Sequence, residues 1–220
     1  MKAYTYLAAF DLDKTILSVN SSRLIVQKAR KAGIMRTKDY LHALYFSIIY
    51  KLRLGDPNRL VTAMALWLKG LDADRVEALV NNDIVPDLAA YFRPEILHEL
   101  DFHRKNGARI LLLSSAISYV CQRVADVLEM DDVVSSEMEV IDGQFTGRPN
   151  GKLVFGKEKM VRMKEYCTAH RYSLTEAWYY GDALSDRYIL SGVGRAVCVS
   201  PEKRLKKLAE QSGWQILTAK

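Results

Sequence analysis

The chain has 220 residues, which fits one large domain or a core that carries a smaller insert. Hydrophobic residues make up 49% and charged residues 26%, so the composition excludes a disordered chain. The 12 Gly and 5 Pro exclude collagen-like and Pro-rich architectures, and the net charge is +6.

The cysteines and the apolar runs point to a cytoplasmic protein. Cys121, Cys167 and Cys198 are too far apart for a disulfide framework or a metal knuckle, and their apolar neighbours favour reduced structural thiols. The longest uncharged run, residues 110–122, is too short to cross a bilayer. Asp11 and Asp13 interrupt the N-terminal apolar stretch before a signal-peptide core is complete, so we expect no signal peptide.

The first part of the chain predicts one strand followed by helices. Residues 4–10 (YTYLAAF) form an apolar run that ends abruptly in acidic residues, as buried strands of parallel sheets do. From about Ser21 to Val80 the pattern is helical. Apolar residues recur at three- and four-residue spacing over 41–52, and the run GDP at 55–57 ends that helix. Two further helices are expected, over 60–68 and 72–81.

The second part of the chain alternates between strand and helix patterns. The expected elements are a strand over 108–113, a helix over 115–130, β-like stretches over 133–141 and 144–146 with a turn at Asp142-Gly143, a helix over 157–170, strands over 177–180 and 195–199, a helix over 202–211 and a strand over 214–217. This alternation predicts an α/β fold with a doubly wound, mostly parallel sheet. We expect residues 1–17 and 92–220 to form this core and residues 18–91 to form an inserted, all-helical cap.

Positive charge is concentrated in the helical part. Residues 18–70 contain ten Lys/Arg against Asp39 and Asp56, a local excess of +8. Such a segment attracts anions such as phosphate esters, nucleic acid or an anionic lipid surface, although the charges could equally serve only to solubilise the helices.

Acidic and hydroxyl side chains follow the predicted strands. The first strand ends in the run DLDKT, with Asp11, Asp13 and Thr15; the second ends in Ser114 and Ser115; a third ends in Gly181-Asp182, with Asp186 four residues later. Ligands of open parallel sheets bind outside the carboxyl ends of the strands. Carboxylates gathered there would repel each other without a cation, and oxygen ligands without His or Cys favour Mg²⁺.

The orientation of the carboxylates depends on where the first strand stops. Asp11 and Asp13 would point the same way on an unbroken strand, whereas a break after Asp11 would aim one at the substrate and the other at a leaving group. Asp182 and Asp186 would share one face at the start of a helix. Each motif alone also fits a turn or an N-cap, so the prediction depends on their shared position at the strand ends.

These residues resemble the motifs of the haloacid-dehalogenase-like (HAD) superfamily, and within it the phosphoserine-phosphatase-like branch with a helical cap. The first motif is DLDKT at 11–15, the second is Ser114, the third is Lys159 in GKEKMVRM, and the fourth is GDALSD at 181–186. The run FTGRPNG before Lys159 is also similar to this branch. Lys152 and Lys157 compete for the third motif, and we prefer Lys159 because it opens the helical run and matches the spacing of the family.

The resemblance implies a Mg²⁺-dependent phosphatase that cleaves a phosphate monoester through an aspartyl-phosphate. Asp11 is then the nucleophile, Asp13 the acid and base, and Lys159 offsets charge, while Ser114 donates a hydrogen bond to a phosphoryl oxygen. The implied metal set is Asp11, Asp13 through its backbone carbonyl, Asp182 and Asp186, where Asp186 supports either the metal or Lys159. Thr15, Ser115 and Asn20 are the candidate substrate-binding residues. The acid at Asp13 also favours phosphate chemistry over dehalogenation, because dehalogenases of the superfamily generally lack it.

Two positions disfavour phosphoserine as the substrate. Phosphoserine phosphatases of this branch hold the substrate ammonium with an acidic residue where this chain has Asn20, and the carboxylate with an arginine where it has Met64. The partner is therefore expected to be another small-molecule phosphate ester.

The stretch 40–50 (YLHALYFSIIY) suggests an alternative. It is apolar and aromatic and is flanked by Lys38, Lys51 and Arg53. It fits a cap helix packed on the core, or a surface that reaches a phospholipid head-group phosphate on an anionic membrane. A basic module that binds nucleic acid without catalysis does not explain the acidic strand ends, and we do not expect nucleic-acid binding.

Overall fold

The computed structural model describes residues 4–52 and 54–219, so Arg53 of the basic segment lies outside the described residues. Its centre is a six-stranded sheet in the order β3-β2-β1-β6-β7-β8, in which every neighbouring pair is parallel. The strands are β1 (Tyr6–Phe10), β2 (Ala108–Ile117), β3 (Asp132–Ser136), β6 (Trp178–Gly181), β7 (Arg195–Val199) and β8 (Gln215–Leu217). The predicted doubly wound α/β class is confirmed.

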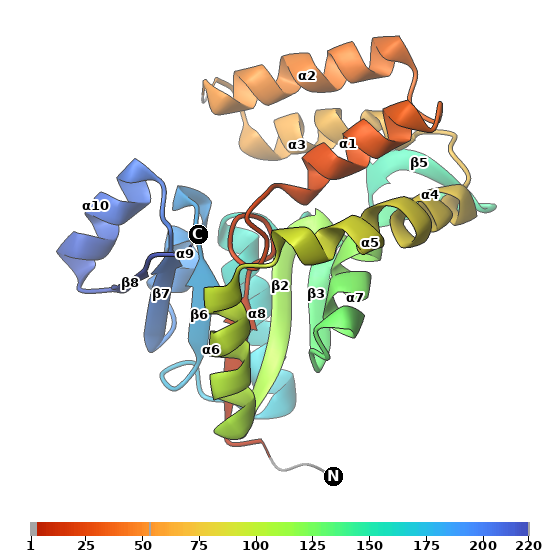
Figure 1. Cartoon of the computed structure of the whole chain (residues 1–220). Helices are drawn as coiled ribbons and strands as arrows, with labels where there is room; N and C mark the ends of the chain where they lie inside the picture. The colour runs from red at the N-terminus through yellow and green to blue at the C-terminus, as the bar shows by residue number, and fades with distance from the viewer. Residues whose placement is uncertain (1–3, 53, 220) are drawn as a thin grey trace.

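Helices cover both faces of the sheet because alternate side chains of each strand point to opposite sides. Ala8 and Phe10 of β1 belong to one buried cluster, with residues of α6 (Pro94–Lys105) and α7 (Ser118–Val127). Leu7 and Ala9 belong to the other, with α8 (Lys157–His170), α9 (Arg187–Leu190) and α10 (Lys203–Ser212). Figure 1 shows α6 in front of the sheet, with the carboxyl ends of the strands directed toward a separate layer of helices.

That helical layer lies between β1 and α6 in the sequence. It contains α1 (Ser21–Lys31), α2 (Thr37–Lys51), α3 (Pro57–Ala65), the 3₁₀ turn η1 (Leu66–Leu68), α4 (Ala73–Leu79), the π-helical turn η2 (Val80–Ile84), α5 (Val85–Leu88) and the 3₁₀ turn η3 (Ala89–Tyr91). Asn20, Asp56 and Asp72 cap α1, α3 and α4, because each side chain accepts a hydrogen bond from a first-turn N–H. α2 lies at the outer edge of the layer (Figure 1).

A two-stranded hairpin joins the helical layer from a distant part of the sequence. It consists of β4 (Met138–Ile141) and β5 (Gln144–Pro149), which are antiparallel. Phe145 exchanges backbone hydrogen bonds with the segment after η1: its N–H donates to Leu71 O at 2.9 Å, and its carbonyl accepts from Gly70 N at 2.8 Å. Phe145 also packs with Leu68 and Val76 in a third buried cluster.

The structure corrects three predicted elements. The stretch 133–141 is not continuous, because β3 belongs to the parallel sheet and β4 to the hairpin. β2 continues through Ser114 and Ser115 to Ile117, with a register shift against β3, so α7 begins later than expected. The sequence analysis predicted no element over the residues of α6, although a proline such as Pro94 is typical of the first turn of a helix. In contrast, α8 and β7 have the predicted bounds.

One buried histidine gives the fold a pH dependence. His103 of α6 is fully buried, with Nδ1 2.8 Å from the Tyr6 hydroxyl and Nε2 2.8 Å from the Tyr180 hydroxyl. The Tyr180 hydroxyl donates to Glu99 Oε2 at 2.6 Å, so it is free to accept the Nε2 proton of a neutral imidazole. Burial lowers the pKa of His103 to about 4.

We therefore expect His103 to destabilise the protein in mild acid. The unfolded imidazole has a pKa of about 6.5, so the unfolded state binds more protons below that pH. The contribution of neutral His103 to the free energy of unfolding is fully present above about pH 6.5. It is lost as the pH falls toward 4, by about 3 kcal/mol in total. Urea unfolding of wild type and His103→Gln between these pH values measures this difference, and parallel stability curves would contradict it.

Candidate active site

The chain leaves the sheet directly after β1. β1 ends at Phe10, and the following residues form tight turns in which Lys14 has a φ of 57°. Asp11 N–H still donates to Tyr180 O at 2.9 Å, which keeps Asp11 against β6. Asp13 has turned away, because its Oδ1 accepts from the N–H of Ser21 at the start of α1, at 2.7 Å. Of the two alternatives for this segment, the structure has the broken strand.

Three predicted carboxylates meet at the carboxyl edge of the sheet. Asp11, Asp182 and Asp186 each contribute an oxygen, and these oxygens lie within 4.8 Å of one another. All three residues are buried, with exposed fractions of 6%, 9% and 0%. Asp11 directly follows β1, and Asp182 and Asp186 follow β6. These two strands are neighbours in the sheet, so their parallel register brings the carboxylates together from distant parts of the sequence.

Lys159 lies within this cluster. The ammonium of Lys159, from the first turn of α8, hydrogen-bonds Asp186 Oδ1 at 2.8 Å and the Tyr179 hydroxyl at 3.0 Å. It also forms an ion pair with Asp11 Oδ1 at 3.0 Å. Of the three lysines considered for this position, Lys152 is exposed and pairs with Glu158, and Lys157 lies over the Tyr188 ring. Lys159 is therefore the lysine that reaches the cluster.

The electrostatics show that one ammonium does not balance three buried carboxylates. Burial, with Asp11 and Asp186 nearby, raises the pKa of Asp182 to about 8. Burial also raises the pKa of Asp11, although Lys159 opposes this shift. Burial opposes the charge on Lys159 itself, but Asp11 and Asp186 more than offset it and raise the pKa of Lys159 well above its usual range.

The carboxylate cluster fits a hard divalent cation. Among the described residues, carboxylate oxygens are the candidate metal ligands there, and burial together with the charges of Asp11 and Asp186 raises the pKa of Asp182. Asp11 and Asp182 are the best-placed ligands. Asp186 already uses both oxygens, since Oδ1 accepts from Lys159 and Oδ2 accepts from Ala183 N at 3.3 Å.

The carboxyl group of Asp13 has a raised pKa. Burial raises its pKa to about 6, while the hydrogen bonds from Ser21 lower it. A carboxyl group with this pKa can hold or release a proton near neutral pH.

The remaining candidate residues lie in the segment after β1 or on β2. Ser114 is buried, its hydroxyl accepts from Ala116 N at 3.3 Å, and its hydrogen bonding lowers the pKa of Asp11. Thr15 is fully buried, and its Oγ1 has no hydrogen-bond partner among the described residues. Ser115 is half-buried on β2. Asn20 caps α1, where its Oδ1 accepts from Ser22 N at 3.1 Å.

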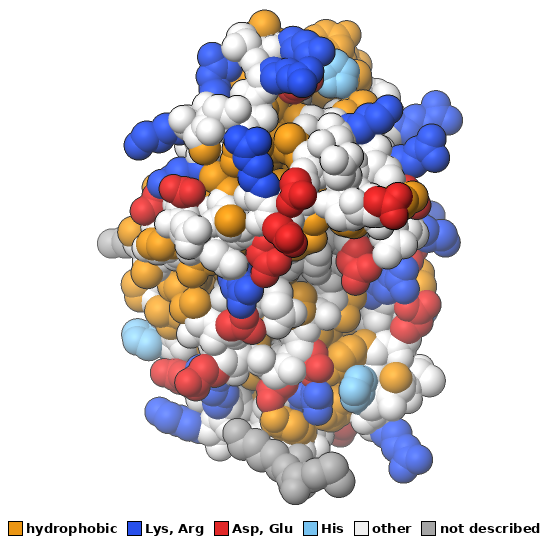
Figure 2. Space-filling view, turned by 90° about the vertical axis from the view of Figure 1, so that its right-hand side faces the viewer, with side chains coloured by type: hydrophobic (Ala, Val, Ile, Leu, Met, Phe, Trp, Pro, Cys, Tyr) orange, Lys and Arg blue, Asp and Glu red, His pale blue; other side chains and the backbone are white. Residues whose placement is uncertain are grey.

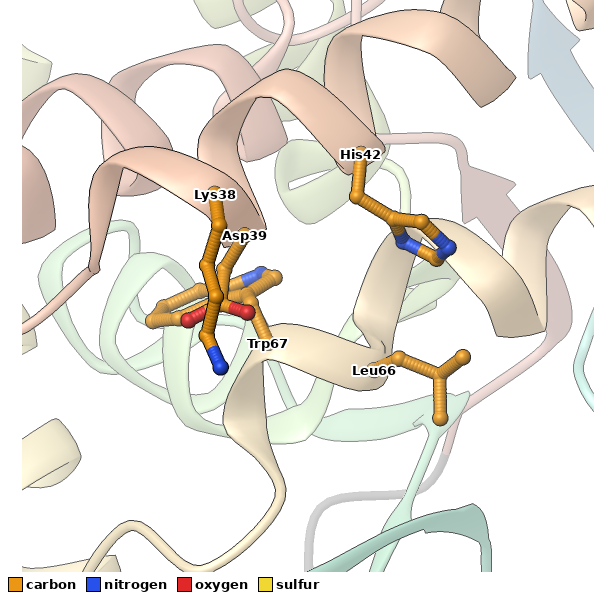
Figure 3. A pocket seen from close by; sticks show the side chains of 5 residues that line it. All are labelled: Lys38, Asp39, His42, Leu66 and Trp67. Carbon is orange, nitrogen blue, oxygen red and sulfur yellow. The ribbon is translucent and has the colours of Figure 1, made fainter.

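A hollow of about 300 Å³ lies outside this site. Its walls are formed by α2 and η1, and no predicted site residue lines it (Figure 3). The lining residues are Lys38, Asp39, His42, Leu66 and Trp67.

Tyr179 is a site residue that the sequence analysis missed. Its hydroxyl accepts from Lys159 and donates to Asp186 Oδ1 at 3.3 Å, so it links the lysine to one carboxylate. In the sequence it is one of several aromatic residues in a buried strand, which gives no signal of a polar contact.

We expect Tyr179→Phe to destabilise the protein by about 1–3 kcal/mol, because the buried ammonium of Lys159 loses one of its two hydrogen bonds. Urea unfolding at neutral pH measures the effect. Tyr172→Phe, at a half-buried tyrosine after α8, is the control and should stay close to wild type. Equal stability of the two variants would show that the Tyr179 hydroxyl contributes nothing.

Comparisons with known proteins place the chain in a family. The haloacid dehalogenase-like hydrolase family matches residues 8–191. A probable phosphatase of Mycobacterium tuberculosis is 25% identical over 214 residues, which cover 96% of this chain and 74% of the relative. A phosphoserine phosphatase of the same organism is 26% identical over 218 residues, covering 96% and 70%. The structure of a substrate-bound phosphoserine phosphatase superposes with a TM-score of 0.73 at 15% identity, covering 98% of this chain and 93% of that one.

Proposed function

The chain belongs to the haloacid dehalogenase-like hydrolase family as a phosphoric monoester hydrolase, and on that premise we propose that Asp11 carries the reaction through an aspartyl-phosphate. The observation that supports this most is the pairing of Asp11 with Lys159 at 3.0 Å, inside a cluster that includes Asp182. A carboxylate held beside a cation can approach an anionic phosphoryl group, which it would otherwise repel.

In the first step, an Asp11 carboxylate oxygen attacks phosphorus, and the bond from phosphorus to the ester oxygen breaks. The leaving alkoxide takes a proton from the Asp13 carboxyl, whose pKa of about 6 suits proton transfer in both directions. In the second step, Asp13 removes a proton from water while the water oxygen attacks phosphorus. The bond to Asp11 then breaks, which releases inorganic phosphate and restores the enzyme.

Other residues support the phosphoryl group and the cation. Asp11, Asp182 and the backbone carbonyl of Asp13 would hold Mg²⁺, which when bound supplies positive charge that offsets the phosphate and the carboxylates. Asp186 positions Lys159, consistent with its hydrogen bonds to Lys159 and Ala183.

The buried hydroxyls suit the phosphate oxygens. Ser114 donates a hydrogen bond to a phosphoryl oxygen, with Ser115 beside it. The unpartnered Thr15 hydroxyl is a further donor.

We also propose that residues 18–91 act as a cap over this edge. Two contacts support this. Ser21, at the start of α1, hydrogen-bonds Asp13, and the β4–β5 hairpin anchors the segment at Leu71. The cap would then exclude water from the reacting phosphate.

The substrate is a phosphate ester other than phosphoserine. Asn20 carries no charge and is engaged in capping α1, and Met64 of α3 has no charged group for a substrate carboxylate. Each missing charge-assisted hydrogen bond costs roughly 1.5–3 kcal/mol of binding.

We expect phosphoserine to be a poor substrate, with kcat/KM at least roughly a hundredfold below the best ester. A panel of phosphoserine, sugar phosphates, nucleotides and lipid phosphates, assayed with and without Mg²⁺, tests this expectation. Phosphoserine as the best substrate would contradict the specificity argument, and the absence of Mg²⁺-dependent hydrolysis across the panel would contradict the reaction itself.

A phospholipid head-group phosphate is the second candidate substrate. The observation that favours it is the exposed apolar surface of α2, whose partner is argued next.

A further inference from the structure

The solvent side of α2 is apolar. Leu41, Leu44, Tyr45 and Ile48 of α2 and Leu52 of the turn directly after it, which we call the α2 outer face, are exposed by 44–63%. They recur at three- and four-residue spacing, so they form one stripe along the helix. Together with Leu54 they account for six of the twelve exposed large hydrophobic residues in the described part of the chain. Such a concentration on one helix and the segment that follows it marks an interaction surface.

The fold does not need this face for its own packing. The opposite side of α2 already packs against α3 and η1, with Ala43 buried and Phe46 and Ile49 half-buried. A helix that is apolar on all sides is normally covered on all sides. The α2 outer face therefore lacks the cover that Ala43, Phe46 and Ile49 have.

Exposed basic side chains lie on the same helical layer as the apolar stripe. Arg36 and Lys38 are exposed at the start of α2, and Arg59 is exposed on α3. Figure 2 shows Lys and Arg side chains around the helical end of the molecule, with apolar atoms between them and acidic side chains lower down. The segment 18–70 has an excess of +8 over its acidic residues. Its partner should therefore be both apolar and negatively charged.

We propose that the α2 outer face docks on an anionic lipid bilayer. Apolar side chains would enter the boundary between head groups and acyl chains, and the flanking basic residues would lie at the anionic head groups. A second copy of the chain would present the same apolar face but also the same excess of positive charge, so a symmetric pair through α2 would be opposed by repulsion.

The docking would be peripheral. Among the described residues, no helix is long and apolar enough to cross a bilayer, so α2 would lie along the surface. Because the carboxyl edge of the sheet faces the helical layer, docking would bring the proposed active site toward the membrane (Figure 1). Membrane binding is a property separate from hydrolysis, and it can be measured without any substrate.

Vesicle co-sedimentation tests the docking. Wild-type protein should sediment with vesicles of phosphatidylcholine and phosphatidylglycerol in equal parts, and much less with phosphatidylcholine alone. Added salt should weaken the binding, because it screens the basic residues. Leu41→Ser with Ile48→Ser should bind roughly tenfold or more weakly, because two apolar anchors are removed. Val127→Ser with Val161→Ser removes exposed apolar groups from α7 and α8 and should bind like wild type.

Hydrolysis of a soluble ester should stay unchanged in the α2 variant, which separates docking from catalysis. Three results would overturn the proposal: no binding of wild type to the anionic vesicles at low salt, equal binding of the α2 variant, or sedimentation of wild type as a dimer that the α2 variant dissociates. The last result would identify the α2 outer face as an interface between copies.

Discussion

Asp11→Asn lowers the turnover of every hydrolysed ester by at least roughly a thousandfold, because an amide cannot form the bond to phosphorus that the carboxylate forms. The change should leave the fold intact. Asp11 contributes to the raised pKa of Asp182, so removing its charge relieves repulsion within a buried cluster. We therefore expect the free energy of unfolding to be equal to that of wild type or slightly higher.

Steady-state assays with the best ester of the panel measure this loss. Asp142→Asn makes the same chemical change at an exposed turn of the β4–β5 hairpin and should leave turnover unchanged. Turnover of Asp11→Asn within tenfold of wild type, in protein of unchanged stability, would remove Asp11 from the role of nucleophile.

Lys159→Met destabilises the protein by about 3–5 kcal/mol, the cost of removing one partner from a buried ion pair. Lys159 is 2% exposed and contacts two carboxylates, Asp11 and Asp186, which would remain buried without their ammonium. Methionine has a similar length, so the effect comes from the lost charge more than from lost volume. Urea unfolding at neutral pH measures it.

The matched control for this change is Lys157→Met, on the exposed side of the same helical turn, with an expected effect below about 1 kcal/mol. The Lys159→Met deficit should shrink as the pH falls, because burial raises the pKa of Asp11 and its carboxyl group no longer needs a cation once it is protonated. Equal stabilities of the two variants would mean that the Lys159 ion pairs contribute nothing to the fold.

The carboxylate cluster could be predicted from the sequence because parallel strands end at a common edge. Asp11 and Asp182 each follow an apolar run, and this pattern is enough to place both at the carboxyl end of one sheet. The choice of Lys159 over its neighbours depended on the motif resemblance, since three lysines occur within eight residues.

Other features depended on contacts that no local pattern encodes. The break between β3 and β4 follows from pairing with Leu71, more than sixty residues earlier in the chain. The link from Tyr179 to Lys159 is invisible because strand periodicity gives the face of a side chain but not its partner. The sequence also left two alternatives for residues 40–50, a helix packed on the core or an exposed surface, since an apolar helix is normally buried.

The most direct test of the account is chemical trapping of the intermediate. The enzyme is mixed with a phosphate-labelled ester and Mg²⁺, quenched in acid and reduced with borohydride, which converts a phosphorylated aspartate to homoserine. Peptide mapping should then find homoserine at position 11, and no modification in Asp11→Asn. Turnover without any trapped aspartate, or with the modification at Asp13 or Asp182, would contradict the assignment of Asp11.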